Sequence, residues 1–478
     1  MSMLRRGLGR RALCARPALI RGISIAAGDG SADEVPSVLT REFIYGSLYA
    51  KEAGYFTTQG REVLHAPGAP IDFGNLWGAS DYRREVSKLY EVKKEAWLTP
   101  VEVFAPYYSH ALAKYMLHSP FCQKQLEIYE IGGGSGSNAL HILNYLKVSN
   151  LRSIWGLDLL SLGVTQDYAP DVYAKTKYTL IEISAVMAER QQQRVATVHP
   201  DQCTVINQDV LTFADSHAPV NNDCFFLAME VLDNLPHDKV HLENGKWRET
   251  VIQLKENGQE AAESDAPSEY PELVEVTRPV QDQLIHQTLQ RFGCDLPLKT
   301  SYKFNSGLAR AVRTAIGKDH VELHSAFIPT GAMQLLNTLR QSFPKHHIIA
   351  ADFDTLPPPK LDATSNVKAI DHPLSPTATS AGPLCAGNAP LVASKLTGVT
   401  QDHDTYLVQG GIADIFFATD FARLKKAYCG LLSRKPDEVS VVKSSAFLKE
   451  FADVNATKTI TGYNPLLEDY SNTSFILS

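Results

Sequence analysis

One stretch constrains the fold more than any other: "EIYEIGGGSGSNALHILNYL", residues 127–146. An apolar run meets four glycines within five positions, and apolar residues at helical spacing follow directly. The residues at helical spacing are Ala139, Ile142, Leu143 and Leu146. A strand that ends on a glycine turn at the start of a helix is typical of a nucleotide-binding site. The stretch therefore predicts an α/β fold that holds a nucleotide at this turn.

Strands alternate with helices after this stretch. Residues 177–184 ("KYTLIEIS"), 202–210 ("QCTVINQDV") and 223–230 ("DCFFLAME") have the pattern of strands. The last of them is apolar almost throughout, as expected for a strand buried on both faces of a sheet. The alternation predicts a parallel, doubly wound sheet.

Composition divides the chain further. We expect a presequence (1–23), an N-terminal helical region (36–125), a nucleotide-binding Rossmann-like core (126–250), an acidic loop with a helical insertion (251–345), and a C-terminal part of the core that carries a long Pro/Ser-rich loop (346–478).

The glycine spacing decides which nucleotide is expected. The sequence reads G-x-G-x-G at Gly132, Gly134 and Gly136. A dinucleotide fingerprint would require a glycine at Ser137, and a phosphate-binding P-loop would require Gly-Lys-Ser/Thr. The order of strand, Glu130, glycines and helix instead resembles the first motif of S-adenosylmethionine-dependent methyltransferases. This cofactor has no phosphate, and glycine lets the backbone approach it closely.

Acidic residues follow the next two strands. Glu182 ends the second strand, where a carboxylate can accept hydrogen bonds from the ribose hydroxyls, and Asp209 ends the third, where it can face the adenine amino group. With Glu130, three carboxylates at successive strand ends lie at one edge of the sheet. The alternative is that Glu182 caps the following helix and that Asp209 is a solvated loop residue.

The segment "MEVLDNLPHDKV", residues 229–240, resembles the MidA-like family, the mitochondrial protein arginine methyltransferases of respiratory complex I assembly. The resemblance spans nearly the whole chain after the N-terminal segment. It includes "EFIYGSLYAKEAGYF", "LTPVEVFAPYYSHALAKYML", "YEIGGGSG", "FIPTGAMQLLNTLRQSFPKHHIIAADFDTLP" and "GGIADIFFATDF". It implies a Rossmann-like class I methyltransferase core with a largely helical additional region. It also implies that the enzyme forms symmetric dimethylarginine on a complex I core subunit.

Two positions depart from related enzymes. Many family members have Asn-Glu at the end of the fourth strand, where this sequence has Met229-Glu230, so a polar neighbour of the glutamate is missing. Arginine methyltransferases outside the family use a pair of glutamates near this strand. Here Glu230 is followed by Asp233 instead.

Arginine chemistry requires a carboxylate, because the guanidinium is protonated at physiological pH. We expect Glu230 to clamp and orient the guanidinium and to receive its proton, with Asp233 three residues further on. His237 either relays the proton or is structural. Tyr107 and Tyr108 either stack on the target arginine or pack in the core, and core packing is expected for at least one of them.

The N-terminal 23 residues differ from the rest of the chain: they contain six arginines and no acidic residue. Arginine-rich, acid-free sequence interleaved with Leu and Ala is typical of a mitochondrial presequence, and the alternative is a disordered basic tail. We expect import into the matrix. Without these arginines the formal net charge falls from −7 to about −13, which suits a basic protein partner.

Other features limit the classes of function. The acidic balance does not indicate a basic surface for nucleic acid, and no apolar run approaches the ~20 residues of a membrane span. The seven cysteines form no C-x-x-C pair, which predicts neither a disulfide framework nor a metal site. A catalytically silent assembly scaffold and, with Ser137 against it, a nicotinamide-dependent oxidoreductase remain alternatives. The sequence leaves a homodimer open.

Residues 148–166 lengthen the connection between the first helix and the second strand by 19 residues. A Rossmann-like unit needs only a short connection here. The segment is either a real insertion, packed as a short helix or used as a binding patch, or a retained intron in the gene model. In both cases we expect few contacts with the core.

Overall fold

The computed structural model describes residues 36–51, 53–58, 64, 67–92, 96–121, 125–154, 172–254, 273–294, 325–360, 386–396 and 399–478. For residues 148–154 and 396, only the backbone is described. The expected presequence, the acidic loop at 255–272 and the Pro/Ser-rich loop at 361–385 therefore lie outside the described residues. So does most of the 148–166 segment, whose first residues continue a helix, and the expectation of few core contacts stays a prediction.

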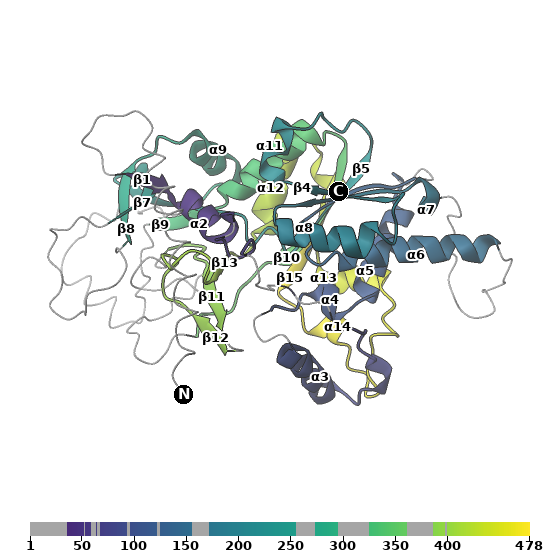
Figure 1. Ribbon diagram of the computed structural model, residues 1–478. Coiled ribbons are helices and arrows are strands. Elements are labelled where there is room, and N and C mark those ends of the chain that lie inside the picture. The colour runs from purple at the N-terminus through teal and green to yellow at the C-terminus, as the bar shows by residue number, and fades with distance from the viewer. Residues whose placement is uncertain are drawn as a thin grey trace, which may run out of the picture.

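A seven-stranded sheet forms the centre of the molecule (Figure 1). Its strand order is β14-β15-β10-β5-β2-β3-β4. The five strands from β10 to β4 are parallel, and β15 runs antiparallel between β10 and β14. The strands are β2 (Glu127–Ile131), β3 (Lys177–Glu182), β4 (Cys203–Asn207), β5 (Cys224–Met229), β10 (His346–Phe353), β14 (Ser440–Lys443) and β15 (Thr473–Leu477). This arrangement confirms the predicted Rossmann-like α/β core.

Helices cover both faces of this sheet, which explains why β5 is apolar throughout. Phe225 and Leu227 point into one hydrophobic core, and Phe226 and Ala228 point into the other, because successive side chains of a strand face opposite sides. The first core contains α5 (Tyr107–His118), α6 (Ser137–Ile154), α7 (Val172–Lys175), α13 (Ser444–Phe451) and α14 (Pro465–Glu468). The second contains α9 (Gln283–Phe292), α11 (Thr330–Ser342) and α12 (Phe421–Leu432).

Short helices follow the strands at the carboxyl edge of the sheet. After β3 come α8 (Ala185–Gln191) and the π-helical segment η3 (Gln192–Ala196), and after β4 comes the 3-10 helix η4 (Val210–Asp215). A further 3-10 helix, η5 (Pro436–Glu438), lies in the C-terminal part of the chain.

The N-terminal region is mainly helical in its described part, as expected. Its helices are α2 (Thr40–Tyr49), the 3-10 helix η1 (Phe73–Asn75), α3 (Ala79–Val92) and α4 (Pro100–Val103), and they lead into α5. A short strand, β1 (Ser37–Leu39), precedes them and pairs with β7. The region therefore reaches both the main sheet and a second sheet.

The second sheet was not expected from the sequence. It is antiparallel and consists of β1, β6 (Asp238–Glu243), β7 (Lys246–Leu254), β8 (Leu273–Pro279) and β9 (Ser325–Ile328). Residues 238–250, assigned to the core, therefore belong to this sheet. The described part of 251–345, expected to be a loop and helices, also contributes two strands, which pair across long sequence separations.

A third, small antiparallel sheet lies beside α2 (Figure 1). It consists of β11 (Leu391–Leu396), β12 (Val399–Asp402) and β13 (Asp414–Phe416). Phe43, Ile44 and Leu48 of α2 share a hydrophobic core with Ile415 of β13 and Phe327 of β9. This core fixes α2 above the carboxyl edge of the main sheet. None of the helices in the described parts of the chain has the length and apolar character that crossing a bilayer requires.

Candidate functional site

The glycine turn between β2 and α6 has the backbone geometry that its sequence predicts. The φ angles of Gly132, Gly134 and Gly136 are 62°, 52° and 80°, in the left-handed region that favours glycine. A Cβ atom at Gly132 would lie 2.8 Å from Val231 Cγ2, and one at Gly134 would lie 2.9 Å from Leu64 Cδ1. The backbone conformation therefore favours glycine at all three positions, and a Cβ atom at Gly132 or Gly134 would also require the neighbouring side chain to shift.

Two adjoining cavities meet at this turn, and Gly132, Gly134, Glu230 and Asn234 line both. The first, here named the Glu182 cavity, has a volume of about 130 Å³ and also contains Asp209 in its wall. The second, the Asp233 cavity, has a volume of about 250 Å³. A ligand that follows the glycine turn can therefore occupy both cavities.

Glu182 lies at the end of β3 and is almost completely buried. Its Oε1 atom accepts a hydrogen bond from the backbone amide of Ser184 (2.9 Å), and its Oε2 atom accepts one from Gln191 Nε2 (2.9 Å). Burial raises the pKa of Glu182 to about 7. A carboxylate has about four acceptor positions, so Glu182 holds the start of the next helix and still has acceptor positions for hydroxyl groups of a ligand.

Gln191 connects Glu182 to the glycine turn. Its Nε2 atom donates to Gly134 O as well as to Glu182 (both 2.9 Å). The side chain is fully buried, and its Oε1 atom has no hydrogen-bond partner among the described residues. Sequence analysis did not identify Gln191, since it lies inside a polar helix with no distinguishing motif.

Asp209 follows β4 and also faces the Glu182 cavity. Its Oδ1 atom accepts a hydrogen bond from the amide of Leu211 (2.9 Å), and its Oδ2 atom accepts one from the hydroxyl of Tyr45 (2.9 Å). The side chain thus caps η4 and is held by α2. Its position at the cavity wall is consistent with the expected contact to a base.

Glu130 supports the glycine turn from within the protein. Its two carboxylate oxygens accept hydrogen bonds from Asn138 Nδ2 and from the hydroxyl of Tyr178 (both 2.8 Å). A Cβ atom at Gly133 would lie 3.3 Å from Glu130 Oε2. Burial raises the pKa of Glu130 to about 6. Its partners therefore connect the turn, the first turn of α6 and the neighbouring strand β3.

Glu230 follows β5 and lies where the two cavities meet. Its φ angle is 52°, which is unusual for a residue with a side chain, and its amide donates to Ala351 O (2.9 Å). Among the described residues, no hydrogen bond or ion pair reaches its half-buried carboxylate. Burial, and then the charge of Asp352, raise the pKa of Glu230 well above its usual range. Glu230 thus combines a strained backbone conformation with a carboxylate that has no partner among the described residues. Such a combination is common at ligand-binding sites.

Further carboxylates surround Glu230. Asp233 is buried, and its Oδ1 atom has no hydrogen-bond partner among the described residues. Burial, followed by the charges of Asp352, Asp414 and Glu230, raises the pKa of Asp233 well above its usual range. Asp414 accepts a hydrogen bond from Asn234 Nδ2 (2.8 Å) and lines the same cavity.

The Asp233 cavity is therefore acidic and aromatic. Five carboxylate residues line it, and its described lining residues include no Lys, Arg or His. The acidic residues are Glu102, Glu130, Glu230, Asp233 and Asp414, and the aromatic residues are Phe56, Trp97, Phe353 and Phe416. A cation gains most from such an environment, because charges interact strongly where water is excluded.

Tyr107 and Tyr108 pack in the core, which was one of the two alternatives for them. Tyr108 is buried in the core, where its hydroxyl contacts Met229 Sδ (3.8 Å), and Tyr107 packs against Phe73. Neither tyrosine lines the Glu182 or the Asp233 cavity. Trp97 takes this place instead. Its Nε1 atom donates to the hydroxyl of Tyr55 (2.8 Å), and Lys395 Nζ lies 4.8 Å from its ring centroid.

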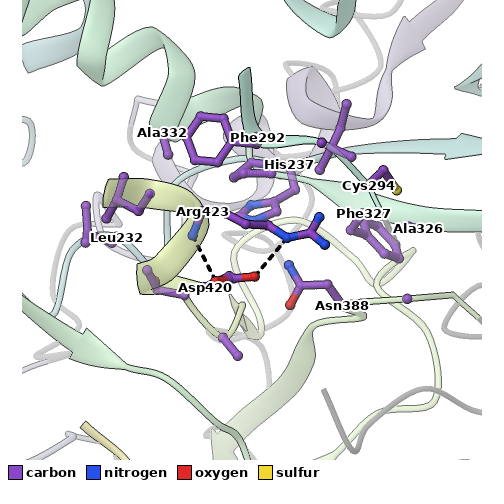
Figure 2. A pocket seen from close by; sticks show the side chains of 17 residues that line it. Leu232, His237, Phe292, Cys294, Ala326, Phe327, Ala332, Asn388, Asp420 and Arg423 are labelled. Carbon is purple, nitrogen blue, oxygen red and sulfur yellow. Dashed lines mark hydrogen bonds and ion pairs between the residues drawn. The ribbon is translucent and has the colours of Figure 1, made fainter. Parts of the chain in front are cut away.

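The structure does not bring His237 to the site. His237 lines a separate cavity together with Arg423, Asn388 and Phe327 (Figure 2). Its ring stacks on Phe417 with a centroid separation of 3.8 Å, and its Nδ1 atom lies 2.8 Å from Leu235 O. Burial lowers the pKa of His237 to about 4, so the ring is neutral at physiological pH. These contacts favour the structural alternative over proton relay.

The residues present fit S-adenosylmethionine. Its ribose hydroxyls need carboxylate acceptors, and buried Glu182 has acceptor positions left beside the glycine turn. Its positively charged sulfonium suits the carboxylates where the cavities meet. The described lining residues of the Glu182 cavity include no Lys or Arg that would hold a phosphate.

Comparisons with known proteins agree with this assignment. Residues 111–438 match the model of a family described as "Putative S-adenosyl-L-methionine-dependent methyltransferase". The fold is similar to that of a Burkholderia thailandensis crystal structure described as a "COG1565 superfamily member and likely methyl transferase", bound to S-adenosyl-homocysteine. That similarity has a TM-score of 0.51 and 15% identity, and it covers 100% of this chain and 95% of the other.

A second structure from the same organism, a native COG1565 superfamily protein, has a TM-score of 0.50 and 14% identity, with coverage of 100% and 95%. A comparison with curated proteins gave no match. At these identities the structures show a shared fold, and the family match indicates the cofactor.

Proposed function

The chain belongs to this family of S-adenosyl-L-methionine-dependent methyltransferases, and we propose that it methylates an arginine side chain of a protein. The observation that carries the proposal is the charge of the Asp233 cavity. Its described lining includes five carboxylate residues and no basic side chain. The guanidinium of arginine is a cation at every physiological pH, and carboxylates recognise its planar fork of donors.

The binding residues and the reacting residues lie in different parts of the site. Glu182, Asp209 and the glycine turn hold the cofactor, whose sulfonium sulfur supplies the methyl group. Glu230 holds the target guanidinium where the two cavities meet, and it aims one nitrogen at that methyl group. The nitrogen forms the new bond to carbon, and the electron pair of the broken carbon–sulfur bond stays on sulfur.

The nitrogen also loses a proton, and Glu230 accepts it. Burial and Asp352 raise the pKa of Glu230, which makes its carboxylate a better proton acceptor than an exposed glutamate. Asp233, with its unpartnered Oδ1 atom, provides the second carboxylate for the guanidinium. A Glu-Asp pair thus takes the place of the glutamate pair of other arginine methyltransferases.

The acceptor protein is proposed from the family resemblance. We infer that the substrate is a core subunit of respiratory complex I, that the product is symmetric dimethylarginine, and that the modification supports assembly of the complex. The acidic composition of the chain after residue 23 supports a basic partner. The arginine-rich segment 1–23 supports import into the mitochondrial matrix, and loss of import on deleting this segment would be measured with isolated mitochondria.

The proposal is tested with Glu230→Gln, which keeps the shape of the side chain and removes its charge. Exposed Glu91 on α3 provides the matched control, Glu91→Gln. Transfer of a labelled methyl group to purified complex I core subunits is expected to fall by a factor of about 10² or more in Glu230→Gln. The affinity for S-adenosyl-homocysteine, measured by calorimetry, is expected to stay within a few-fold of the wild type.

Two outcomes would count against the proposal. Unchanged transfer by Glu230→Gln would place the proton acceptor elsewhere, with Asp233 the next candidate. Cofactor binding by the wild type without transfer to any arginine would favour the catalytically silent scaffold.

A further inference from the structure

A buried carboxylate outside the predicted site holds the glycine turn. Glu102 of α4 accepts a hydrogen bond from the hydroxyl of Ser135 at Oε1 (2.5 Å) and from that of Ser137 at Oε2 (2.8 Å). Ser135 lies within the glycine turn, and Ser137 is the first residue of α6. Helix α4 is itself fixed at its first turn, because Thr99 Oγ1 accepts from the backbone amide of Glu102 (3.3 Å).

The carboxyl group of Glu102 lies at the cavity without a basic partner among the described residues. The side chain is only 7% exposed and lines the Asp233 cavity. No ion pair to it occurs among the described residues, and Arg194 Nη1 donates instead to Ser135, at Oγ (2.6 Å) and at the backbone oxygen (3.3 Å). Burying a carboxylate is unfavourable unless it is paired. Two of its roughly four acceptor positions are still unused, so it can accept from a cationic donor in the cavity.

Glu130 also lines this cavity, and its two oxygens likewise accept one hydrogen bond each, from Asn138 and Tyr178. Both partners are buried, and the carboxylate is 2% exposed. Glu102 is 7% exposed and is therefore the more accessible of the two glutamates beside the turn.

The position of Glu102 relative to Glu182 indicates which donor it meets. The two carboxylates line different cavities, and the glycine turn lies between them as the common wall. The cofactor likewise has two different ends: a nucleoside, which suits Glu182 and Asp209, and an amino acid with an ammonium group. A cofactor that follows the turn with its nucleoside in the Glu182 cavity places its amino-acid end in the cavity of Glu102.

We propose that Glu102 binds the α-ammonium group of the cofactor and couples this contact to the glycine turn through Ser135 and Ser137. The inference rests on the cofactor assignment and is independent of which acceptor is methylated. Glu102 thereby selects S-adenosylmethionine and S-adenosyl-homocysteine over adenosine derivatives that lack the amino-acid end.

The test compares two neutral thioethers, S-adenosyl-homocysteine and 5′-methylthioadenosine, which lacks the amino-acid end. Glu102→Gln can still accept from one serine hydroxyl and donate to the other, so the turn is expected to stay in place. We expect this variant to bind S-adenosyl-homocysteine about 10- to 100-fold more weakly, as for loss of a hydrogen bond to a charged group. The dissociation constant of 5′-methylthioadenosine, measured by calorimetry, is expected to be unchanged.

Two further measurements separate the contribution of the ammonium group from that of the rest of the cofactor. Deaminated S-adenosyl-homocysteine keeps the carboxylate and lacks the amine. Glu102→Gln is therefore expected to bind this ligand no more weakly than the wild type does. Glu102→Asp keeps the charge but moves the carboxylate away from the cavity, because the side chain is one methylene shorter. This variant is also expected to bind S-adenosyl-homocysteine more weakly and 5′-methylthioadenosine normally. Glu91→Gln is the control for the change of charge.

The proposal is overturned if Glu102→Gln weakens both thioethers by the same factor, because Glu102 would then act only through the shape of the turn. It is also overturned if the affinity for S-adenosyl-homocysteine does not change. Since no protein substrate is added, failure of this test would leave the arginine proposal standing, and failure of the arginine proposal would leave this test unaffected.

Discussion

The backbone amide of Asp233 donates a hydrogen bond to Oδ2 of Asp352 (3.0 Å), which brings two buried carboxylates together at the ends of neighbouring strands. Burial raises the pKa of Asp352 to about 7, and the charge of Asp352 adds to the burial that raises the pKa of Asp233. With Glu230 beside them, like charges are concentrated where repulsion is strong. The arrangement destabilises the protein without ligand and favours any cation that enters.

The first prediction follows from this repulsion. Glu230 has a raised pKa in the folded protein, so the folded state holds the proton more tightly than the unfolded chain does. Its contribution to stability is present below the unfolded pKa and is lost as the pH rises toward the folded pKa. Glu230→Gln, which cannot ionise, is therefore expected to raise the melting temperature of the ligand-free protein by about 2 °C at pH 8 and hardly at pH 4.

Thermal unfolding at both pH values checks this prediction, with Glu91→Gln as the control for an exposed glutamate. A Glu230→Gln protein that is less stable than the wild type at pH 8 would show that Glu230 makes a favourable contact in the folded state.

The second prediction concerns Gly134. A valine there would meet Leu64 and project from a wall that both cavities share. Gly134→Val is expected to weaken binding of S-adenosyl-homocysteine by a factor of about 100 or more, while the protein still folds. Part of the loss in stability comes from the positive φ angle alone, at about 1–2 kcal/mol.

Gly245 separates the two effects, because its φ angle is also positive (77°) but no atom lies within 4 Å of its Cβ position. Gly245→Val is expected to lose similar stability and to keep normal binding. Calorimetry measures the affinity of both variants for S-adenosyl-homocysteine, and thermal unfolding measures their stability. A Gly134→Val protein with wild-type affinity would place the cofactor elsewhere.

The third prediction is a pH dependence of cofactor binding. Glu182 has a pKa of about 7 in the ligand-free protein, mainly because it is buried. Its ionised form is the better acceptor for ribose hydroxyls, so affinity is expected to fall as the pH falls through 7, by about tenfold between pH 8 and pH 6. Glu182→Gln is expected to bind weakly at both pH values. A pH dependence that persists in this variant would assign the titration to another group.

Gln191 gives a fourth prediction, as a positioning residue for Glu182. Its hydrogen bond stabilises the ionised form of Glu182 and lowers the pKa of that carboxyl from what burial alone would give. Gln191→Leu is expected to weaken S-adenosyl-homocysteine by about tenfold and to move the pH dependence of binding to higher pH. Weaker binding without a shift in the pH profile would mean that Gln191 acts only through Gly134.

The residues whose proximity the sequence predicts correctly are those that follow from one local rule. Parallel strands present their carboxyl ends at one edge of a sheet, so Glu182, Asp209 and Glu230 could be placed together from strand patterns alone. The glycine turn could likewise be predicted from one short stretch of sequence. His237 was misleading because the chain turns away after Pro236 into β6 and buries the ring against Phe417.

Residues contributed by distant segments could not be found in this way. Glu102 lies in an apolar run that resembles core sequence, and Asp414 lies in a strand of the third sheet. Their approach to the glycine turn depends on how α4 and β13 pack, which no local pattern specifies. The second sheet was missed for the same reason: β1 pairs Val38 with Ile252, a contact between opposite halves of the chain.

Mass spectrometry of the modified residue tests most directly whether this protein methylates arginine, as we propose. Complex I core subunits would be isolated from cells that lack the protein and are supplied with the wild type or with Glu230→Gln. We expect symmetric dimethylarginine on a core subunit with the wild type and its absence with the variant. The same dimethylarginine in cells that lack the protein, or in cells with Glu230→Gln, would overturn the proposal.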